Sequence, residues 1–157
     1  MKKLYLIGGT MGIEKTTVCQ ELKQRLPQSV FLDGDWCWDA SPFQVTEETK
    51  EMVQDNICHL LNNFIHCSAY TTILFGWVMH EQSIIDSLLE QIDISNCEVI
   101  CISLIANADT LREQFRLDIE KGIRSVDAIE PSVERLPLYE QLNTIKIYTD
   151  GKYLHPR

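Results

Sequence analysis

A glycine-rich turn close to the amino end limits the architectures open to this chain. An apolar run from Leu4 to Ile7 leads into Gly8 and Gly9, and a helical pattern begins a few residues later. The order strand, glycine-rich turn, helix is typical of loops whose backbone N–H groups wrap an anion, because the helix N-terminus adds partial positive charge. Such a turn indicates a parallel α/β fold.

The residues of the turn match most of the Walker A pattern, which has Gly, four residues, Gly, Lys, and then Ser or Thr. Gly9, Lys15 and Thr16 occupy their positions, whereas Glu14 stands where the second glycine is expected. The predicted phosphate-binding residues are Gly8, Gly9, Thr10, Met11, Gly12, Ile13, Glu14, Lys15, Thr16 and Thr17. Lys15 is expected to contact the terminal phosphates, and the Thr16 hydroxyl to bind Mg²⁺.

Glu14 weakens this match in two ways. A non-glycine residue held in a left-handed conformation costs ~1–2 kcal/mol. A carboxylate about 4 Å from one phosphate charge adds up to ~4 kcal/mol of repulsion at an effective dielectric of about 20. Nucleotide affinity then falls by several orders of magnitude, unless the Glu14 side chain points outward into water. The competing interpretation is an ordinary glycine-rich βα turn that binds no ligand.

Length and charge exclude other classes of protein. With 157 residues, the chain suits a single domain, residues 1–157, whose core needs no disulfide or metal. A net charge of −9 argues against a duplex nucleic-acid binder, which needs a basic surface. The apolar run after Met1-Lys2-Lys3 is too short for a signal peptide or membrane span. We expect a cytoplasmic monomer or homodimer with no membrane partner.

The six cysteines show neither CxxC spacing nor a Cys/His metal pattern. Several of them fall on apolar faces of predicted elements. They are therefore expected to be reduced, buried side chains that behave as small hydrophobic residues.

Helical and strand patterns alternate along the rest of the chain. Helices are predicted over residues 16–25, 47–67, 81–92, 107–121 and 132–142, and strands within 29–36, 71–77, 97–105 and 144–149. Thr46 and Thr49 mark the start of the second helix, and Pro137 is expected to bend or split the last one. The alternation predicts an α/β three-layer sandwich, with a five-stranded parallel sheet and helices on both faces.

Charged residues that suit a phosphate ligand occur in two places. Asp33 and Asp35 follow the second predicted strand, and ligands of open α/β sheets bind at the carboxyl ends of strands. Arg112 and Arg116 lie four residues apart on one helix face. The candidates for a local positive cleft are Arg112, Arg116, Arg124 and Arg135.

Each of these features also has an explanation without a ligand. An Asp-Gly pair is common in turns at strand ends, which accounts for Asp33. Arg112 and Arg116 also fit a solvated helix face paired with nearby acids. Arg124 and Arg135 fit ordinary surface charges, because spacing alone says little about them. A polar patch at a helix N-terminus accounts for His80 beside Glu81.

With the loop and the strand-end acids in place, the chain resembles the small P-loop kinases, which include adenylate, shikimate and gluconate kinases and chloramphenicol phosphotransferase. The specific part of the likeness is Gly9-Thr10-Met11-Gly12 with Lys15-Thr16-Thr17, and the order of elements extends it over nearly the whole chain. The resemblance implies ATP-dependent phosphoryl transfer with Mg²⁺. The acceptor would be a hydroxyl or phosphate on a small molecule, such as a nucleotide or nucleoside.

The resemblance also implies individual roles. Asp33-Gly34-Asp35 is similar to the Asp-x-Asp of shikimate-type kinases, which implies that Asp33 supports the metal with Thr16 and that Asp35 orients or deprotonates the acceptor. Residues 107–135 resemble the lid segment of that group, which implies that Arg112 and Arg116, with Arg124, neutralise the transferring group. Trp36 is expected beside the acceptor, where it is able to stack on a base or sugar. Thr149-Asp150-Gly151 corresponds to the adenine-binding turn.

Two departures leave alternatives open. The third predicted strand ends in Phe75-Gly76-Trp77 and carries no Walker B aspartate. Together with Glu14, this absence motivates the alternative of a non-catalytic nucleotide-binding or pseudokinase domain. Hydrolysis as a switch or ATPase ranks last, because no water-positioning residue is evident. The kinases that this chain resembles usually have a further helix after the last strand. This sequence ends at Arg157, soon after that strand, which is what a truncated chain would show.

Overall fold

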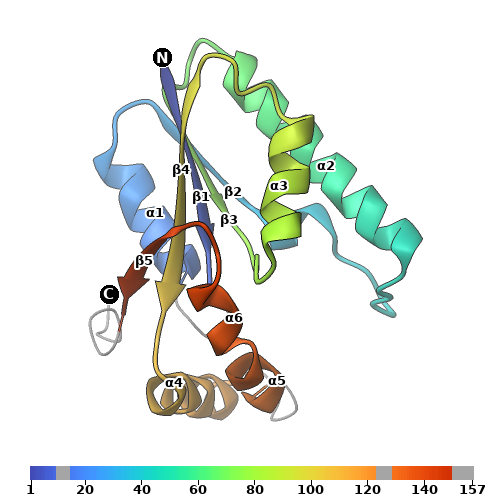
Figure 1. Ribbon diagram of the computed structural model, residues 1–157, viewed down its shortest axis with the longest axis vertical. Coiled ribbons are helices and arrows are strands. Elements are labelled where there is room, and N and C mark those ends of the chain that lie inside the picture. The colour runs from blue at the N-terminus through green and yellow to red at the C-terminus, as the bar shows by residue number, and fades with distance from the viewer. Residues whose placement is uncertain (10–14, 123–128, 150–157) are drawn as a thin grey trace.

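The computed structural model, which describes residues 1–9, 15–122 and 129–149, has a parallel sheet between layers of helices (Figure 1). The strands are β1 (Lys2–Gly8), β2 (Ser29–Asp33), β3 (Thr72–Gly76), β4 (Cys97–Ile105) and β5 (Ile145–Tyr148). Their order across the sheet is β2-β3-β1-β4-β5, and each adjacent pair is parallel. The predicted three-layer α/β fold is therefore confirmed.

The central position of β1 follows from its composition. Leu4, Leu6 and Ile7 are almost wholly buried, as expected for a parallel strand that is covered on both faces. Leu4 and Leu6 face one core cluster and Ile7 the other, because alternate residues of a strand point to opposite faces. In the register of the sheet Gly76 pairs with both Ile7 and Asp33, so the carboxyl ends of β1, β2 and β3 lie together.

Seven helices occur in the described residues. They are α1 (Lys15–Arg25), η1 (Gly34–Cys37), α2 (Glu47–His66), α3 (Gln82–Gln91), α4 (Ala108–Glu120), α5 (Ile129–Glu134) and α6 (Leu136–Glu140). Figure 1 shows α2 and α3 on one side of the sheet and α1 on the other. Tyr139 of α6 joins the α2 and α3 core, whereas Phe115 of α4 joins the α1 core.

The structure differs from the predicted helices in two places. The helix predicted over 132–142 is two helices, and Pro137 lies in the first turn of α6, in agreement with the expected split. The predicted start after Pro131 is wrong, because α5 begins at Ile129. Pro131 fits there, since backbone N–H groups of a first turn have no partner within the helix. The short helix η1 was not predicted.

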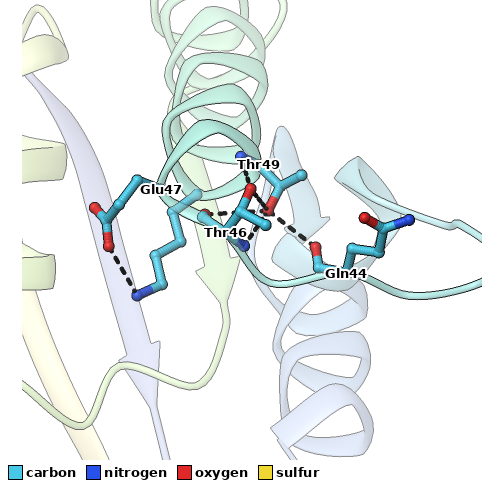
Figure 2. A network of polar contacts seen from close by, with 5 residues as sticks. Gln44, Thr46, Glu47 and Thr49 are labelled. Atoms are coloured by element: carbon cyan, nitrogen blue, oxygen red, sulfur yellow. Dashed lines mark hydrogen bonds and ion pairs between the residues drawn. The ribbon is translucent and has the colours of Figure 1, made fainter.

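The N-terminus of α2 is fixed by a reciprocal cap, which confirms the predicted start (Figure 2). The backbone N–H of Thr49 donates to Thr46 Oγ1 at 3.1 Å, and the backbone N–H of Thr46 donates to Thr49 Oγ1 at 2.8 Å. Thr49 Oγ1 also donates to the Gln44 carbonyl oxygen at 2.9 Å. These bonds satisfy N–H groups that the helix leaves unpaired, and they hold the preceding loop against α2.

Replacing Thr46 with alanine is expected to lower the free energy of unfolding by ~1 kcal/mol, because the side-chain half of the cap is lost. Urea unfolding followed by circular dichroism measures the change. Thr110→Ala is the matched control, since Thr110 contributes its backbone N–H, not its side chain, to the cap of α4. An equal loss in both variants would show that the cap does not stabilise α2.

All six cysteines are free thiols. Cys19 and Cys58 are buried, whereas Cys67 is exposed, so the expectation of burial is wrong for Cys67. Burial raises the pKa of Cys19 to about 12, against the opposing effect of the Lys15 charge, so the thiol stays protonated at neutral pH. In the described part of the chain, none of the helices has the length and apolar character that crossing a bilayer requires.

Candidate functional site

The described part of the glycine-rich turn begins where β1 ends. Gly9 has a φ of 153°, and a Cβ atom there would lie 2.9 Å from the Leu104 carbonyl oxygen. That space accepts only glycine without rearrangement. The same Cβ position is 3.4 Å from Cδ of Lys15, so the stem of Lys15 lies over Gly9 at the N-terminus of α1. The structure therefore places the lysine beside the bare backbone of the turn.

Asp33 links β2 to α1. Its Oδ2 accepts a hydrogen bond from Thr16 Oγ1 at 3.0 Å, and its Oδ1 accepts one from the backbone N–H of Asp35 at 2.9 Å. The carboxylate is 9% exposed and caps η1. The two residues predicted to support a metal are thus in direct contact.

A hydroxyl and a carboxylate at the end of a sheet fit Mg²⁺, which prefers oxygen ligands and binds proteins through one or two side chains plus phosphates and water. Within residues 1–9, 15–122 and 129–149 there is no cluster of three or more His, Cys, Asp or Glu side chains that would hold a metal alone. A magnesium ion at Thr16 and Asp33 would therefore depend on a phosphate ligand.

The turn after Asp33 carries the two residues predicted to contact the acceptor. Asp35 is exposed on η1. Trp36 is 58% exposed, and its ring packs edge-on against Phe31 with centroids 5.2 Å apart. Their roles toward a substrate stay predictions.

Trp77 connects this turn to a cavity. A Cβ atom on Gly34 would lie 2.4 Å from Cγ of Trp77, so the indole rests directly on the backbone between Asp33 and Asp35. The backbone N–H of Trp77 donates to the Ile7 carbonyl oxygen at 3.2 Å, which anchors the residue beside β1. The same tryptophan lines a cavity of about 430 Å³. A ligand in that cavity is separated from the strand-end acids by one aromatic ring.

Three segments form the cavity: the loop before α2 with the first turns of that helix, the loop between β3 and α3 with the first turn of α3, and the junction of α5 and α6. The lining residues are Trp38, Val45, Glu47, Lys50, Glu51, Val53, Gln54, Trp77, Val78, His80, Ser83, Ile84 and Arg135. The cavity combines two indole rings with charged groups, as in many small-molecule sites.

The sequence interpretation gave two of these residues another role. His80 was assigned to a polar patch at a helix N-terminus and Arg135 to the ordinary surface, yet both line the cavity. His80 follows the carboxyl end of β3, which is the kind of position where ligands of parallel sheets bind. Arg135 carries no comparable signal, because its place depends on how α5 and α6 pack.

Arg112 and Arg116 lie on the exposed face of α4, where each contacts acids. Arg112 Nε is 3.3 Å from Glu130 Oε1, and Arg116 Nη1 is 2.6 Å from Glu120 Oε1. Arg116 also donates to Glu113, which lowers the pKa of that carboxyl. This arrangement matches the solvated, acid-paired face that was the competing interpretation. Neither arginine lines the cavity, and a role in catalysis would require these ion pairs to open.

The remaining predicted site residues lie outside the described residues. They are Thr10, Met11, Gly12, Ile13 and Glu14 of the phosphate loop and Arg124 of the lid-like segment. The predicted adenine-binding residues Asp150 and Gly151 also fall outside.

Comparison with known proteins identifies the family of the chain. A family model described as an AAA domain matches residues 6–131, which is most of the chain. The match spans the phosphate loop, the strand-end acids and two of the three cavity-forming segments, and it ends before the junction of α5 and α6. No curated protein matches the sequence.

The fold is shared with several solved structures. A sugar kinase from Janibacter sp. has a TM-score of 0.72 at 14% identity, over 99% of this chain and 88% of that chain. A tunicamycin resistance protein from Deinococcus radiodurans has a TM-score of 0.68 at 17% identity, covering 99% and 89%. A gluconokinase from Sinorhizobium meliloti has a TM-score of 0.66 at 14% identity, covering 98% and 84%. At such identities the likeness shows the fold.

Proposed function

The chain belongs to the AAA domain family and has the fold of the small P-loop kinases, and on that premise we propose that it transfers a phosphoryl group from ATP to a hydroxyl or phosphate of a small molecule. The observation that carries the proposal is the hydrogen bond of 3.0 Å between Thr16 and Asp33 beside Gly9 and Lys15. It joins a phosphate-loop hydroxyl to a strand-end carboxylate, and this pairing supports a role of the two oxygen groups in binding a magnesium nucleotide.

The chain's own residues have distinct tasks in this proposal. The backbone N–H groups of the loop and the N-terminus of α1 bind the phosphates. Lys15, held over Gly9, neutralises charge that develops on the terminal phosphate. Bound Mg²⁺-ATP supplies the phosphoryl group and shields its charge. Asp33 orients Thr16, and Asp35 binds the acceptor hydroxyl and accepts its proton.

The cavity next to Trp77 is the proposed acceptor site. Its volume of about 430 Å³ falls in the range of small-molecule pockets. Asp35 does not line the cavity, and the Trp77 ring rests on the neighbouring Gly34. In this proposal the body of the acceptor occupies the cavity, and its hydroxyl extends past Trp77 to reach the Asp35 carboxylate. We also propose that residues 107–135 are a lid-like segment of a single domain. The proposed place of the reaction is the cytoplasm, and the proposed functional unit is a monomer or homodimer.

Asp35→Asn is expected to lower kcat by about 10²–10⁴-fold, because the amide keeps the shape of the side chain but does not accept the acceptor's proton. The measurement is ATP consumption in a screen of hydroxyl-bearing metabolites and nucleotides. Asp39→Asn, an exposed carboxylate four residues further on, is the matched control and should keep full activity. Full activity in Asp35→Asn would remove this residue as the base.

A second candidate function is nucleotide binding without catalysis. It is favoured by Glu14 in the phosphate loop and by β3, which ends at Gly76 without an acid. A domain of this kind binds Mg²⁺-ATP, yet consumes none with any acceptor. Tight binding without turnover over the whole screen would favour this function over phosphoryl transfer.

A further inference from the structure

The glycine between the two strand-end acids is there for a steric reason. Gly34 is buried at the start of η1, and its φ lies outside the left-handed region, so its backbone conformation is open to other residues. A side chain at this position would instead overlap Trp77. Its Cβ atom would lie closer than 3.0 Å to Cγ, Cδ1 and Cδ2 of the indole, a separation that real Cβ atoms essentially never show. Trp77 therefore fills the space that any other residue at position 34 needs.

Trp77 is itself held in place. Its backbone N–H donates to the Ile7 carbonyl oxygen at 3.2 Å, near the end of β1. Its ring packs against the core formed by α2 and α3, with the Phe75 ring 6.2 Å away between centroids. A side chain fixed both at its backbone and by packing gives a rigid support to the groups that touch it.

The carboxylate of Asp33 supplies a second support for the same turn. Its Oδ1 accepts the backbone N–H of Asp35, and its Oδ2 accepts the Thr16 hydroxyl. The segment from Asp33 to Asp35 is thus fixed by these bonds and by the indole on Gly34. Removing the indole would leave the turn with one support fewer, so the positions of both acids depend on Trp77.

We infer that Trp77 is a positioning residue: its indole holds Gly34, and through Gly34 it fixes the Asp35 carboxylate and the pair of Asp33 and Thr16. The roles of the two acids rest on the proposed function, whereas the contact of Trp77 with Gly34 stands on the geometry. Trp77 also lines the cavity, so the turn and a bound acceptor contact the same side chain. A displacement of about 1 Å at a reacting group costs up to ~10²-fold in rate, so loss of the indole lowers kcat.

Replacements of Trp77 test this role by steady-state kinetics with the acceptor found in the screen. Trp77→Phe keeps ring atoms at Cγ, Cδ1 and Cδ2, which are the atoms nearest to Gly34, and should retain kcat within about threefold. Trp77→Ala removes these atoms and should lower kcat by about tenfold or more. Trp38 lines the same cavity but packs on Phe43, with ring centroids 4.3 Å apart. Trp38→Ala should therefore raise KM for the acceptor more than it lowers kcat.

A double-mutant cycle gives a sharper test. Gly34→Ala places a methyl group against the ring and should lower kcat by about tenfold or more. In the Trp77→Ala chain the same methyl group meets no ring, so its further effect should be less than about twofold. Circular dichroism checks that each variant folds. If Trp77→Ala does not fold, Trp77→Val takes its place in the cycle.

The cycle is repeated without any acceptor, by calorimetric titration with Mg²⁺-ATP. Asp33 is next to Gly34 and bonds to Thr16, so Gly34→Ala should weaken nucleotide binding in the native chain and not in the Trp77→Ala chain. The Glu14→Gly chain serves as the parent for both variants if the native chain binds too weakly.

Equal losses from Gly34→Ala in the two chains would overturn the inference, because the glycine would then serve the turn and not the contact with Trp77. Native kcat in Trp77→Ala, or equal losses in Trp77→Phe and Trp77→Ala, would also overturn it. If no acceptor is phosphorylated but nucleotide binding shows the non-additive effect, the positioning role stands and the proposed function fails. If transfer occurs and the two changes are additive, the function stands and the inference fails. Absence of nucleotide binding in every chain contradicts both.

Discussion

Lys15→Ala is expected to lower kcat/KM for phosphoryl transfer by on the order of 10³-fold, as removal of one preorganised charge from the transferring group does in comparable sites. Lys15 begins α1, and its stem lies 3.4 Å from the Cβ position of Gly9. The Lys15 side chain therefore lies beside the backbone that would wrap the phosphates. Alanine keeps the helix but leaves the developing charge without its compensating cation.

Steady-state kinetics with the best acceptor from the screen measure this loss. Lys3→Ala is the matched control, because Lys3 is exposed near the amino end of β1, at the opposite end of the sheet from the loop. The control should retain native kinetics. If Lys15→Ala retains them as well, Lys15 does not contact the transferring group, and the turn after β1 is an ordinary βα connection.

Glu14→Gly is expected to raise the affinity for Mg²⁺-ATP by at least tenfold. The gain combines relief of a non-glycine backbone conformation, ~1–2 kcal/mol, with relief of charge repulsion, up to ~4 kcal/mol at an effective dielectric of about 20. Because ~1.4 kcal/mol corresponds to a factor of ten, either effect alone brings a measurable change. Calorimetric titration on the native and variant chains gives the two dissociation constants.

Glu14→Gln separates the two contributions, because it removes the charge and keeps the bulk and the backbone preference. If Glu14→Gln recovers affinity for Mg²⁺-ATP, the loss in the native chain comes from charge repulsion. If only Glu14→Gly recovers this affinity, the loss comes from the backbone conformation. Equal, tight binding by the native chain and both variants would show that Glu14 points away from the nucleotide. That result would leave the phosphate loop intact and remove the reason to suspect impaired activity.

Much of the fold was predictable because local patterns and sheet geometry agree. The apolar run of β1 and the repeating apolar residues of α2 identify their elements, and Thr46 and Thr49 identify the cap. The strand order was not predictable from periodicity, since it depends on which crossover each helix makes. The helix η1 was missed because one turn after Asp33 leaves no periodic signal.

The candidate site was predictable where its residues follow the carboxyl ends of strands, because these ends lie at one edge of the sheet. Asp33 and Thr16 meet because β1 and β2, which lie on either side of β3, end at the same edge of the sheet. Trp77, His80 and Arg135 line one cavity only because segments that are far apart in the sequence pack together. Their spacing in the sequence therefore does not predict that they meet. Arg112 illustrates the reverse: its spacing suggests a phosphate clamp, whereas Glu130 lies within reach of its guanidinium.

The most direct test of the account is a crystal structure of the chain with Mg²⁺ and a non-hydrolysable ATP analogue, with Glu14→Gly as the parallel sample. The predicted result is a triphosphate wrapped by the backbone after β1, with Lys15 at the terminal phosphates and the metal beside Thr16 and Asp33. Empty density at that position in both crystals, at analogue concentrations that saturate related kinases, would contradict the central claim.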